Sequence, residues 1–370
     1  MTSLPQTYEQ SRLRFRDDLS AVRKLWPAAQ IENHPLPGEE ELSIDWIFAD
    51  ALKNRQKLFI LTTGEHGIEG YYGSVMLQLF IEDFLPRLHP DTTGILLVHS
   101  LNPWGMKHHR HTNSSNVDLN RSFVHDFSTL PGSNPDYDLF SPLLEPVRPL
   151  KNIQWEVLAF IFQTVINLTR YGMIRMREAT MRGQFSHPQG IYYGGHNLQE
   201  ETRFIIALFE KSIPSFNEIV MLDMHTGYGP RGRMTLVTSA QEKMTSEQIV
   251  NRFGIPLVAA ANPQEFYSIQ GDMIEYLYAW MRTNFPDKYF FAATCDIGTL
   301  GDSIGAVIRS LYTIVFENSL YWHGGSEASR RWIQAEYTQL YAPPLDDRFE
   351  QALADCRKGF EGILKEEGYF

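Results

Sequence analysis

The sequence predicts an α/β protein: a three-layer α/β/α domain on a mixed, mostly parallel sheet. Short apolar runs of strand length alternate with longer segments whose apolar residues recur at helical spacing. Residues 58–62 and 94–100 read as buried strands, and residues 72–84 between them read as a helix. Strand, helix and strand in this order indicate a parallel βαβ unit. Repeated along most of the chain, the alternation is typical of a sheet covered by helices on both faces.

The remaining elements follow the same two patterns. Residues 8–26 have the spacing of an amphipathic helix, and residues 42–48 are apolar enough for a strand. Further helices are expected at 155–171, 198–211, 303–323 and 346–365, and further strands at 218–223, 234–239, 255–261 and 289–294. No internal repeat is visible, so the sequence does not predict a solenoid.

We expect one catalytic domain over residues 1–370 that carries an insertion. With 370 residues and 43% hydrophobic content, the chain can bury a substantial core. Residues 126–149 are rich in Pro, Ser and Asp and lose apolar periodicity, whereas residues 155–171 recover it. We therefore place the insertion at about residues 124–186, where it would shape a neighbouring pocket.

Charge and composition exclude several classes of partner. The formal net charge of -11 argues against nucleic acid and against an anionic membrane surface. Residues 1–14 lack the apolar core of a signal peptide, and no apolar run is long enough to span a bilayer. These features predict a cytoplasmic protein, while the oligomeric state stays open. Cys295 and Cys356 have no CxxC partner, so any metal must be held by His and carboxylates.

A glycine-rich loop at residues 63–70 follows the first strand of the βαβ unit. Ligands bind at this edge in open α/β sheets. The loop carries His66 and Glu69 three positions apart, between glycines that let the backbone bend. This pair can hold a zinc ion if a third ligand arrives from elsewhere. The alternative interpretation is a glycine-rich turn with a solvated Glu69.

The third ligand is expected at His225, which follows the strand at 218–223. Two His and one Glu would leave an open zinc position for water. Asp223 or Asp118 could accept the second N–H of a ligating imidazole and fix its tautomer. His225 could instead be a strand-end His bonded to a neighbouring carbonyl.

A third group of motifs follows the strand at 94–100. It comprises an Asn-Pro-x-Gly motif at 102–105, Arg110, and Val-Asp-Leu-Asn-Arg-Ser-Phe at 117–123. Together with the two histidine segments, in this order and spacing, the chain resembles the zinc carboxypeptidase family. The resemblance covers roughly residues 58–123 and 218–301, and implies the carboxypeptidase/phosphorylase-hydrolase type of fold. It is greatest to a branch with a Gly-x-His-Gly-x-Glu-Gly loop and a Tyr-Gly-Gly motif, which residues 193–195 match. We assign that motif no chemistry; a tight turn is its default interpretation.

The resemblance implies one zinc ion as cofactor, held by His66, Glu69 and His225. It also implies that Arg110 stabilises the oxyanion formed when water adds to a carbonyl. A solvated basic loop is the alternative for Arg110. His108, His109 and His111 surround it, but the interleaved cations disfavour a second metal site.

The resemblance also implies which residues bind the substrate. Asn120 and Arg121 would bind a substrate carboxylate, Arg121 through its two-pronged guanidinium. Tyr267, ahead of Gly271 and Glu275, is similar to a mobile tyrosine that covers the substrate, although a packed aromatic is the simpler interpretation.

The general base departs from the family pattern. The family places a Glu in a Thr-x-Glu context on a late strand, whereas this chain has Asp296 after Thr294. An Asp is one methylene shorter, so its carboxylate would fall short by roughly 1.5 Å, enough to cost about a hundredfold in rate. Glu317 is the next candidate, although it lies within an expected helix, where a structural role is simpler.

The leading hypothesis is a zinc hydrolase of the metallocarboxypeptidase type. It would cleave an amide bond next to a free carboxylate, in a small peptide or an N-acyl amino acid. An N-acyl amino acid deacylase of the aspartoacylase type is the enzymatic alternative. A second alternative, motivated by Asp296, is a catalytically weakened protein that binds zinc and a carboxylate-bearing ligand. The third is a structural α/β protein without metal.

Overall fold

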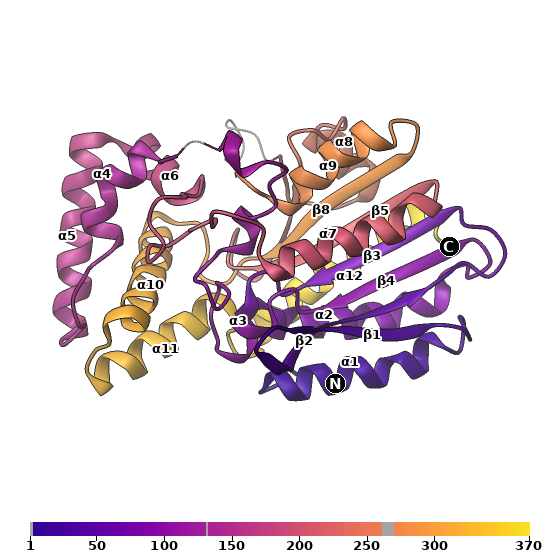
Figure 1. Cartoon of the computed structure of the whole chain (residues 1–370), viewed down its shortest axis with the longest axis horizontal. Helices are drawn as coiled ribbons and strands as arrows, with labels where there is room; N and C mark the ends of the chain where they lie inside the picture. Colours follow the sequence, from indigo (N-terminus) through magenta and orange to yellow (C-terminus); the bar gives the residue numbers. More distant parts are fainter. Residues whose placement is uncertain (1–2, 131, 261–269) are drawn as a thin grey trace.

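The computed structural model describes residues 3–130, 132–260 and 270–370 and contains one mixed sheet (Figure 1). Its order is β1-β2-β4-β3-β5-β8-β6-β7. The strands are β1 (Gln30–Leu36), β2 (Glu39–Ala49), β3 (Lys57–Thr63), β4 (Thr93–His99), β5 (Glu218–Thr226), β6 (Met234–Thr238), β7 (Val258–Ala260) and β8 (Tyr289–Ile297). The predicted mixed α/β class is confirmed, and each of the eight strands except β1 overlaps a run predicted from the sequence.

Parallel strands form the centre of the sheet. β3 pairs in parallel with both β4 and β5, and β5 pairs in parallel with β8. The pairs β1–β2, β2–β4 and β6–β8 are antiparallel. In the β5–β8 register His225 lies opposite Asp296. Because all four central strands point the same way, their carboxyl ends lie together at one edge of the sheet.

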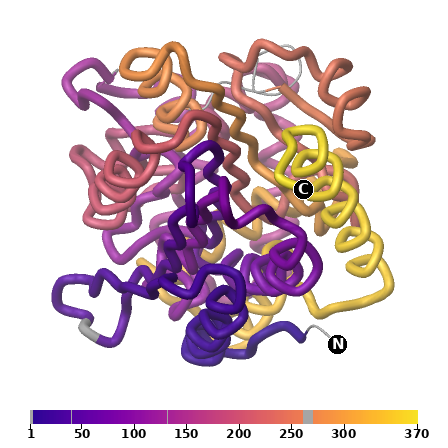
Figure 2. Tube along the Cα trace, turned by 90° about the vertical axis from the view of Figure 1, so that its right-hand side faces the viewer, coloured from indigo at the N-terminus to yellow at the C-terminus, as the bar shows by residue number. Residues whose placement is uncertain are grey.

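Helices cover both faces of the sheet, as the sequence predicted (Figure 2). One apolar cluster packs α1 (Tyr8–Val22), α2 (Gly70–Asp83), α8 (Ser246–Phe253) and α12 (Asp347–Glu366) on one face. A second cluster packs α7 (Glu200–Ser212) and α9 (Met273–Asn284) on the other face. Successive side chains of a strand point to opposite faces. Phe59 of β3 accordingly belongs to the first cluster, and its neighbour Ile60 belongs to the second.

A third apolar cluster lies beyond the end of the sheet. It joins α4 (Pro135–Leu144), α5 (Ile153–Tyr171) and α6 (Met173–Met181) to α10 (Ile304–His323) and α11 (Glu327–Tyr341). Figure 1 shows these helices at the left, away from the strands. The segment 126–149, in which the sequence showed no periodicity, contains α4. Pro135 follows Asn134, whose side chain accepts hydrogen bonds from the first turn and so starts the helix.

No single helix in the described part of the chain is long and apolar enough to cross a membrane. The bent pair α5 and α6, which meet at 116°, meets the criteria of length and composition only when the two are taken together.

His99, at the end of β4, is a buried titratable side chain of the fold. Its Nε2 lies 2.8 Å from Ser11 Oγ of α1, and its ring stacks on Phe15 at 5.4 Å. Burial lowers the pKa of His99 to about 4, with Arg14 lowering it and Asp45 opposing that effect. At a pH below the ordinary pKa of histidine, His99 binds a proton in the unfolded chain but not in the folded chain. The free energy of unfolding therefore falls as the pH falls.

Replacing His99 by Gln should remove this contribution. Between pH 6.5 and pH 4, His99 alone is expected to lower the free energy of unfolding by up to about 1.4 kcal/mol per pH unit. Urea unfolding at pH 7 and pH 4.5 should show a difference between the two pH values that is smaller in His99→Gln by about 2 kcal/mol. An equal pH dependence in both proteins would contradict the assignment.

Candidate metal centre

The loop after β3 is held in place by close backbone packing. Gly64 has a φ of +68°, which glycine adopts without strain. A Cβ on Gly67 would lie 2.2 Å from the carbonyl carbon of Gly105 in α3 (Pro103–Lys107), so only glycine fits there. The Ile68 N–H donates to the carbonyl of Arg110 at 2.9 Å. These contacts fix the direction in which His66 and Glu69 leave the loop.

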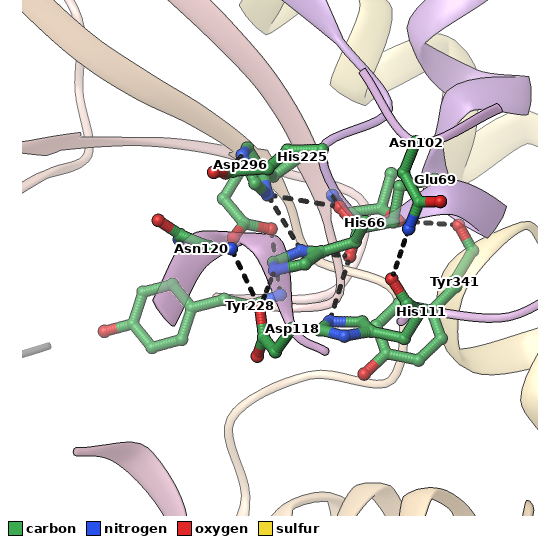
Figure 3. A network of polar contacts seen from close by, with 12 residues as sticks. His66, Glu69, Asn102, His111, Asp118, Asn120, His225, Tyr228, Asp296 and Tyr341 are labelled. Atoms are coloured by element: carbon green, nitrogen blue, oxygen red, sulfur yellow. Dashed lines mark hydrogen bonds and ion pairs between the residues drawn. The ribbon is translucent and has the colours of Figure 1, made fainter. Parts of the chain in front are cut away.

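The structure brings His66, Glu69 and His225 together (Figure 3). The Nδ1 atoms of the two imidazoles lie 3.2 Å apart. Glu69 Oε1 lies 3.0 Å from His66 Nδ1, and Glu69 Oε2 lies 3.3 Å from His225 Nδ1. In a tetrahedral zinc site with bonds of about 2.0–2.2 Å, ligand atoms lie roughly 3.3–3.6 Å apart. The three side chains are thus within a few tenths of an ångström of that spacing.

Each imidazole is oriented by a carboxylate on its other nitrogen. Asp118 Oδ1 lies 3.2 Å from His66 Nε2, and Asp223 Oδ2 lies 2.5 Å from His225 Nε2. Asp223 is itself fixed by the Thr62 hydroxyl, which donates to its Oδ1 at 2.6 Å. Both acids suggested by the sequence are therefore placed to hold Nδ1 of each ring toward the centre of the cluster.

The cluster has an excess of buried negative charge. Four carboxylates around the two imidazoles are at most 2% exposed: Glu65, Glu69, Asp118 and Asp223. Arg121 Nη1, 4.0 Å from Asp118 Oδ2, is the one guanidinium paired with them among the described residues. Neither oxygen of Glu65 has a hydrogen-bond partner within that part of the chain, although its Oε2 lies 3.4 Å from His225 Nε2. Buried carboxylates need a compensating positive charge, so the donor set fits a divalent cation.

The protonation of these groups reflects the same crowding. Burial disfavours the charged form of His66, but Glu69 and Asp118 outweigh it and raise the pKa of His66 to about 10. Burial would raise the pKa of Glu69, but His66 and His225 lower it below its usual range. Burial raises the pKa of Glu65 to about 7 against the opposing effect of His225. Two protonated imidazoles thus offset the acids, and a bound cation would displace those protons.

Asp296 lies beside His225 on the neighbouring strand (Figure 3). Its Oδ1 accepts a hydrogen bond from the backbone N–H of Tyr228 at 2.9 Å. Burial, followed by the charge of Glu69, raises the pKa of Asp296 to about 7. The residue lies at the edge of the cluster and is only partly exposed.

Arg110 and Glu317 contact each other rather than the histidine cluster. Arg110 Nε lies 2.9 Å from Glu317 Oε1, and its guanidinium stacks 3.7 Å over Tyr321. Its Nη2 also donates to Asn116 and Asn318. Both side chains line a separate cavity of about 470 Å³ between the loop and the helices α10 and α11. Their side-chain hydrogen bonds are with each other and with these neighbours, and Arg110 Nη1 is buried without a hydrogen-bond partner among the described residues.

Asn120 and Arg121 lie next to the cluster, and some of their polar atoms already form hydrogen bonds within the protein. Asn120 Oδ1 accepts from the N–H of Met273 at 3.2 Å. Arg121 Nη1 donates to the carbonyl of Asn120 at 2.9 Å, while its buried Nε has no partner among the described residues. Tyr267 lies outside the described residues.

Sequence reasoning missed the position of His111. Its ring stacks on His66 with centroids 3.6 Å apart, and its Nε2 lies 3.8 Å from Glu69 Oε1. Burial and the neighbouring His66 lower the pKa of His111 to about 3. His108 and His109 instead contact Trp104 and Tyr71. Nothing in the run of histidines distinguishes His111, because its place depends on how the loop folds back onto residues 66–69.

Two further combinations of ligand atoms are close enough to hold a cation. They are Glu65 with His66 and His225, and His66 with His111 and Asp118. All of these combinations share His66, so they overlap one centre rather than form separate ones.

The Tyr-Gly-Gly segment supports the loop that carries Asp118. The Asp118 N–H donates to the carbonyl of Tyr193 at 2.8 Å. A Cβ on Gly194 would lie 2.2 Å from the Phe185 ring and 2.7 Å from the carbonyl oxygen of Arg121. This motif, for which the sequence indicated no chemistry, therefore has a packing role beside the cluster.

The fold and cluster define a three-layer α/β/α domain with a histidine–carboxylate centre at one sheet edge. The chain belongs to the family described as "Protein of unknown function (DUF2817)", whose model matches residues 5–355. A search of the curated proteins returned no match.

Several solved structures are similar in fold. Carboxypeptidase A from Helicoverpa armigera is 12% identical, with a TM-score of 0.46, covering 91% of this chain and 74% of that chain. A metallo-carboxypeptidase from Burkholderia cenocepacia is 11% identical, with a TM-score of 0.43 and coverage of 96% and 68%. Murein-tripeptide amidase MpaA from Escherichia coli O157 is 16% identical, with a TM-score of 0.37 and coverage of 86% and 94%. At these values we transfer no residue role from them.

Replacing Gly194 by Ala should destabilise the protein. The new methyl group would meet both Phe185 and the backbone of Arg121, and overpacking of this kind costs about 1–3 kcal/mol. The matched control is Gly305→Ala in α10, where nothing lies within 4 Å of the added Cβ. That substitution should leave the free energy of unfolding unchanged or raise it by up to about 1 kcal/mol. Urea unfolding measures both, and equal effects would contradict the packing role.

Proposed function

We propose that this protein is a zinc-dependent hydrolase that cleaves an amide bond next to a free carboxylate. The observation that carries the proposal is the convergence of His66 Nδ1, His225 Nδ1 and Glu69 within 3.0–3.3 Å of one another. Two His and one Glu match the ligands of hydrolytic zinc sites with an open position. When bound there, zinc would lower the pKa of a coordinated water and polarise a carbonyl.

Asp296 is the proposed proton acceptor. It lies opposite His225 in the β5–β8 register, beside the proposed ligands. The N–H of Tyr228 holds Oδ1, which leaves Oδ2 to take a proton from water and pass it to the leaving amine. The raised pKa, about 7, is suited to accepting and returning a proton near neutral pH.

Asn120 and Arg121 are the proposed contacts of the substrate carboxylate. The two side chains are at most 8% exposed, and Arg121 keeps an unpartnered Nε within the described residues. A carboxylate that satisfied this donor would gain a charge-assisted hydrogen bond. A small peptide and an N-acyl amino acid both carry such a group, so a deacylase of the aspartoacylase type remains the second candidate.

His111 is added to the proposed site as an orienting side chain. Its ring stacks on His66, whereas Arg110 pairs with Glu317. The low pKa of His111 keeps its ring neutral near neutral pH, so it can pack on a metal-bound His66 without repelling the cation.

Metal content tests the ligand set. Protein purified without added metal should contain about one equivalent of zinc by elemental analysis, and His225→Ala should contain less than about a tenth of that. His108→Ala is the matched control, since His108 contacts Trp104 away from the cluster, and it should keep its zinc. No bound metal in the wild type, with folding intact, would leave the structural α/β alternative.

Replacement of Asp296 separates an enzyme from a weakened binding protein. Asp296→Asn should lower kcat for amide hydrolysis by about a hundredfold or more while zinc content is unchanged. Glu317→Gln should have a much smaller effect, since Glu317 pairs with Arg110. The assay uses a panel of small peptides and N-acyl amino acids. A large gain in rate in Asp296→Glu would instead indicate a protein that has lost activity, and a large loss in Glu317→Gln alone would reassign the base.

A further inference from the structure

The outer face of α5 carries apolar side chains that the described part of the chain leaves exposed. Trp155 is 70% exposed, Phe162 is 68% exposed and Leu158 is 56% exposed. The face continues through Ile161, Val165 and Ile166 and onto Met173 and Ile174 at the start of α6. Figure 1 shows α5 at the far left of the molecule, where its outer side faces away from the sheet.

The exposed residues form one stripe. Positions 155, 158, 162 and 165 repeat at intervals of three and four, so they share a side of the helix. The opposite side is anchored, because Phe160 packs edge-on against Phe316 of α10 at 5.5 Å and Ile153 is buried. We define the apolar stripe as residues 155, 158, 161, 162, 165 and 166. An exposed patch of this kind on a globular protein indicates an interaction surface.

Unpaired positive charge marks both ends of the apolar stripe. Lys151 precedes Trp155 by four residues, and Arg170 follows Ile166 by four residues. Neither cation forms an ion pair within the described residues, and both are exposed. The one acid in α5, Glu156, is bound at 2.5 and 2.6 Å by both guanidinium nitrogens of Arg148. The surface is therefore apolar along its length and positive at its ends.

This distribution of charge disfavours a second copy of the chain as the occupant. In an antiparallel pair of α5 helices centred on the apolar stripe, Lys151 of one copy would face Arg170 of the other. A parallel pair would place each cation beside its own counterpart. Glu156 cannot pair with these cations in either arrangement, since it already pairs with Arg148. Like charges at a contact oppose association.

We propose that the apolar stripe binds an anionic lipid bilayer, with α5 lying flat in the headgroup region. Trp155 and Phe162 would enter the boundary between headgroups and acyl chains. Lys151 and Arg170 would extend their aliphatic stems along the apolar surface and place their charges on lipid phosphates. The helix does not need to span the bilayer, because its inner side stays packed on α10.

The net charge of -11 had predicted that an anionic membrane would be avoided. That expectation considers only the net charge of the whole chain and not where the charges lie on its surface. At physiological ionic strength, charges more than about 8 Å from the surface are largely screened, so the residues next to the bilayer dominate. Lys151 and Arg170, at the two ends of the apolar stripe, would lie next to the bilayer.

Flotation with lipid vesicles tests the proposal on the full chain. The protein should float with vesicles of phosphatidylcholine containing about 30% phosphatidylglycerol, and roughly tenfold less with pure phosphatidylcholine. Raising the salt concentration should weaken flotation. The double variant Trp155→Ser/Phe162→Ser should lower binding at least about tenfold, because two large apolar side chains no longer enter the bilayer.

Two further variants make the test specific. Leu13→Ser on α1 removes a leucine that is 61% exposed outside the apolar stripe, and it should bind as the wild type does. Lys151→Glu/Arg170→Glu should lose binding to the anionic vesicles only. The proposal is overturned if the wild type does not float with anionic vesicles or if the double serine variant floats equally well. It is also overturned if light scattering of lipid-free protein shows a dimer that the serine variant dissolves, since a second copy would then be the occupant.

Discussion

The concentration of buried charge where β3 and β5 end is the constraint on which the rest of the structure depends. Four carboxylates and two imidazoles share a volume from which water is largely excluded. Removing ions from water costs several kcal/mol for each, and mutual attraction offsets this only if every group is paired. The fold supplies Thr62 for Asp223 and the N–H of Thr226 for Glu69 at 2.8 Å, but it leaves Glu65 without a hydrogen-bond partner among the described residues. These buried carboxylates need a compensating positive charge, which protons on the two imidazoles or a bound cation in their place would supply.

The geometry of this centre follows from the sheet register. β3 and β5 are parallel neighbours, with Thr62 opposite Asp223. One strand further, His225 lies opposite Asp296. A shift of one residue in either pairing would turn these side chains to the other face of the sheet. The apolar runs that bury β3 and β5 on both faces therefore also determine which polar side chains meet at their ends.

Much of the fold and part of the site could be predicted from the sequence. The strands at the centre of the sheet are apolar runs that a residue pattern identifies, and the motif at 63–70 and His225 identify the strand ends. β1 was missed because its apolar residues do not alternate regularly and most of its residues are exposed. α4 was missed because its Pro and Asp residues are unfavourable within a helix and obscure its apolar spacing. The family resemblance assigned Arg110 to the site, and the structure adds that Glu317 and Asn318 of α10 bind its guanidinium. Such long-range pairing leaves no mark in local sequence.

α10 contacts two distant parts of the protein, the helix α5 and the loop that carries His66 and Glu69. Phe316 packs against Phe160 of α5, and the next residue, Glu317, forms an ion pair with Arg110. The carbonyl of Arg110 accepts from the N–H of Ile68, between His66 and Glu69. α10 therefore contacts both α5, through Phe316, and the strand-end loop, through Glu317 and Arg110. The helices beyond the end of the sheet thus share one supporting helix with the loop that carries the candidate metal ligands.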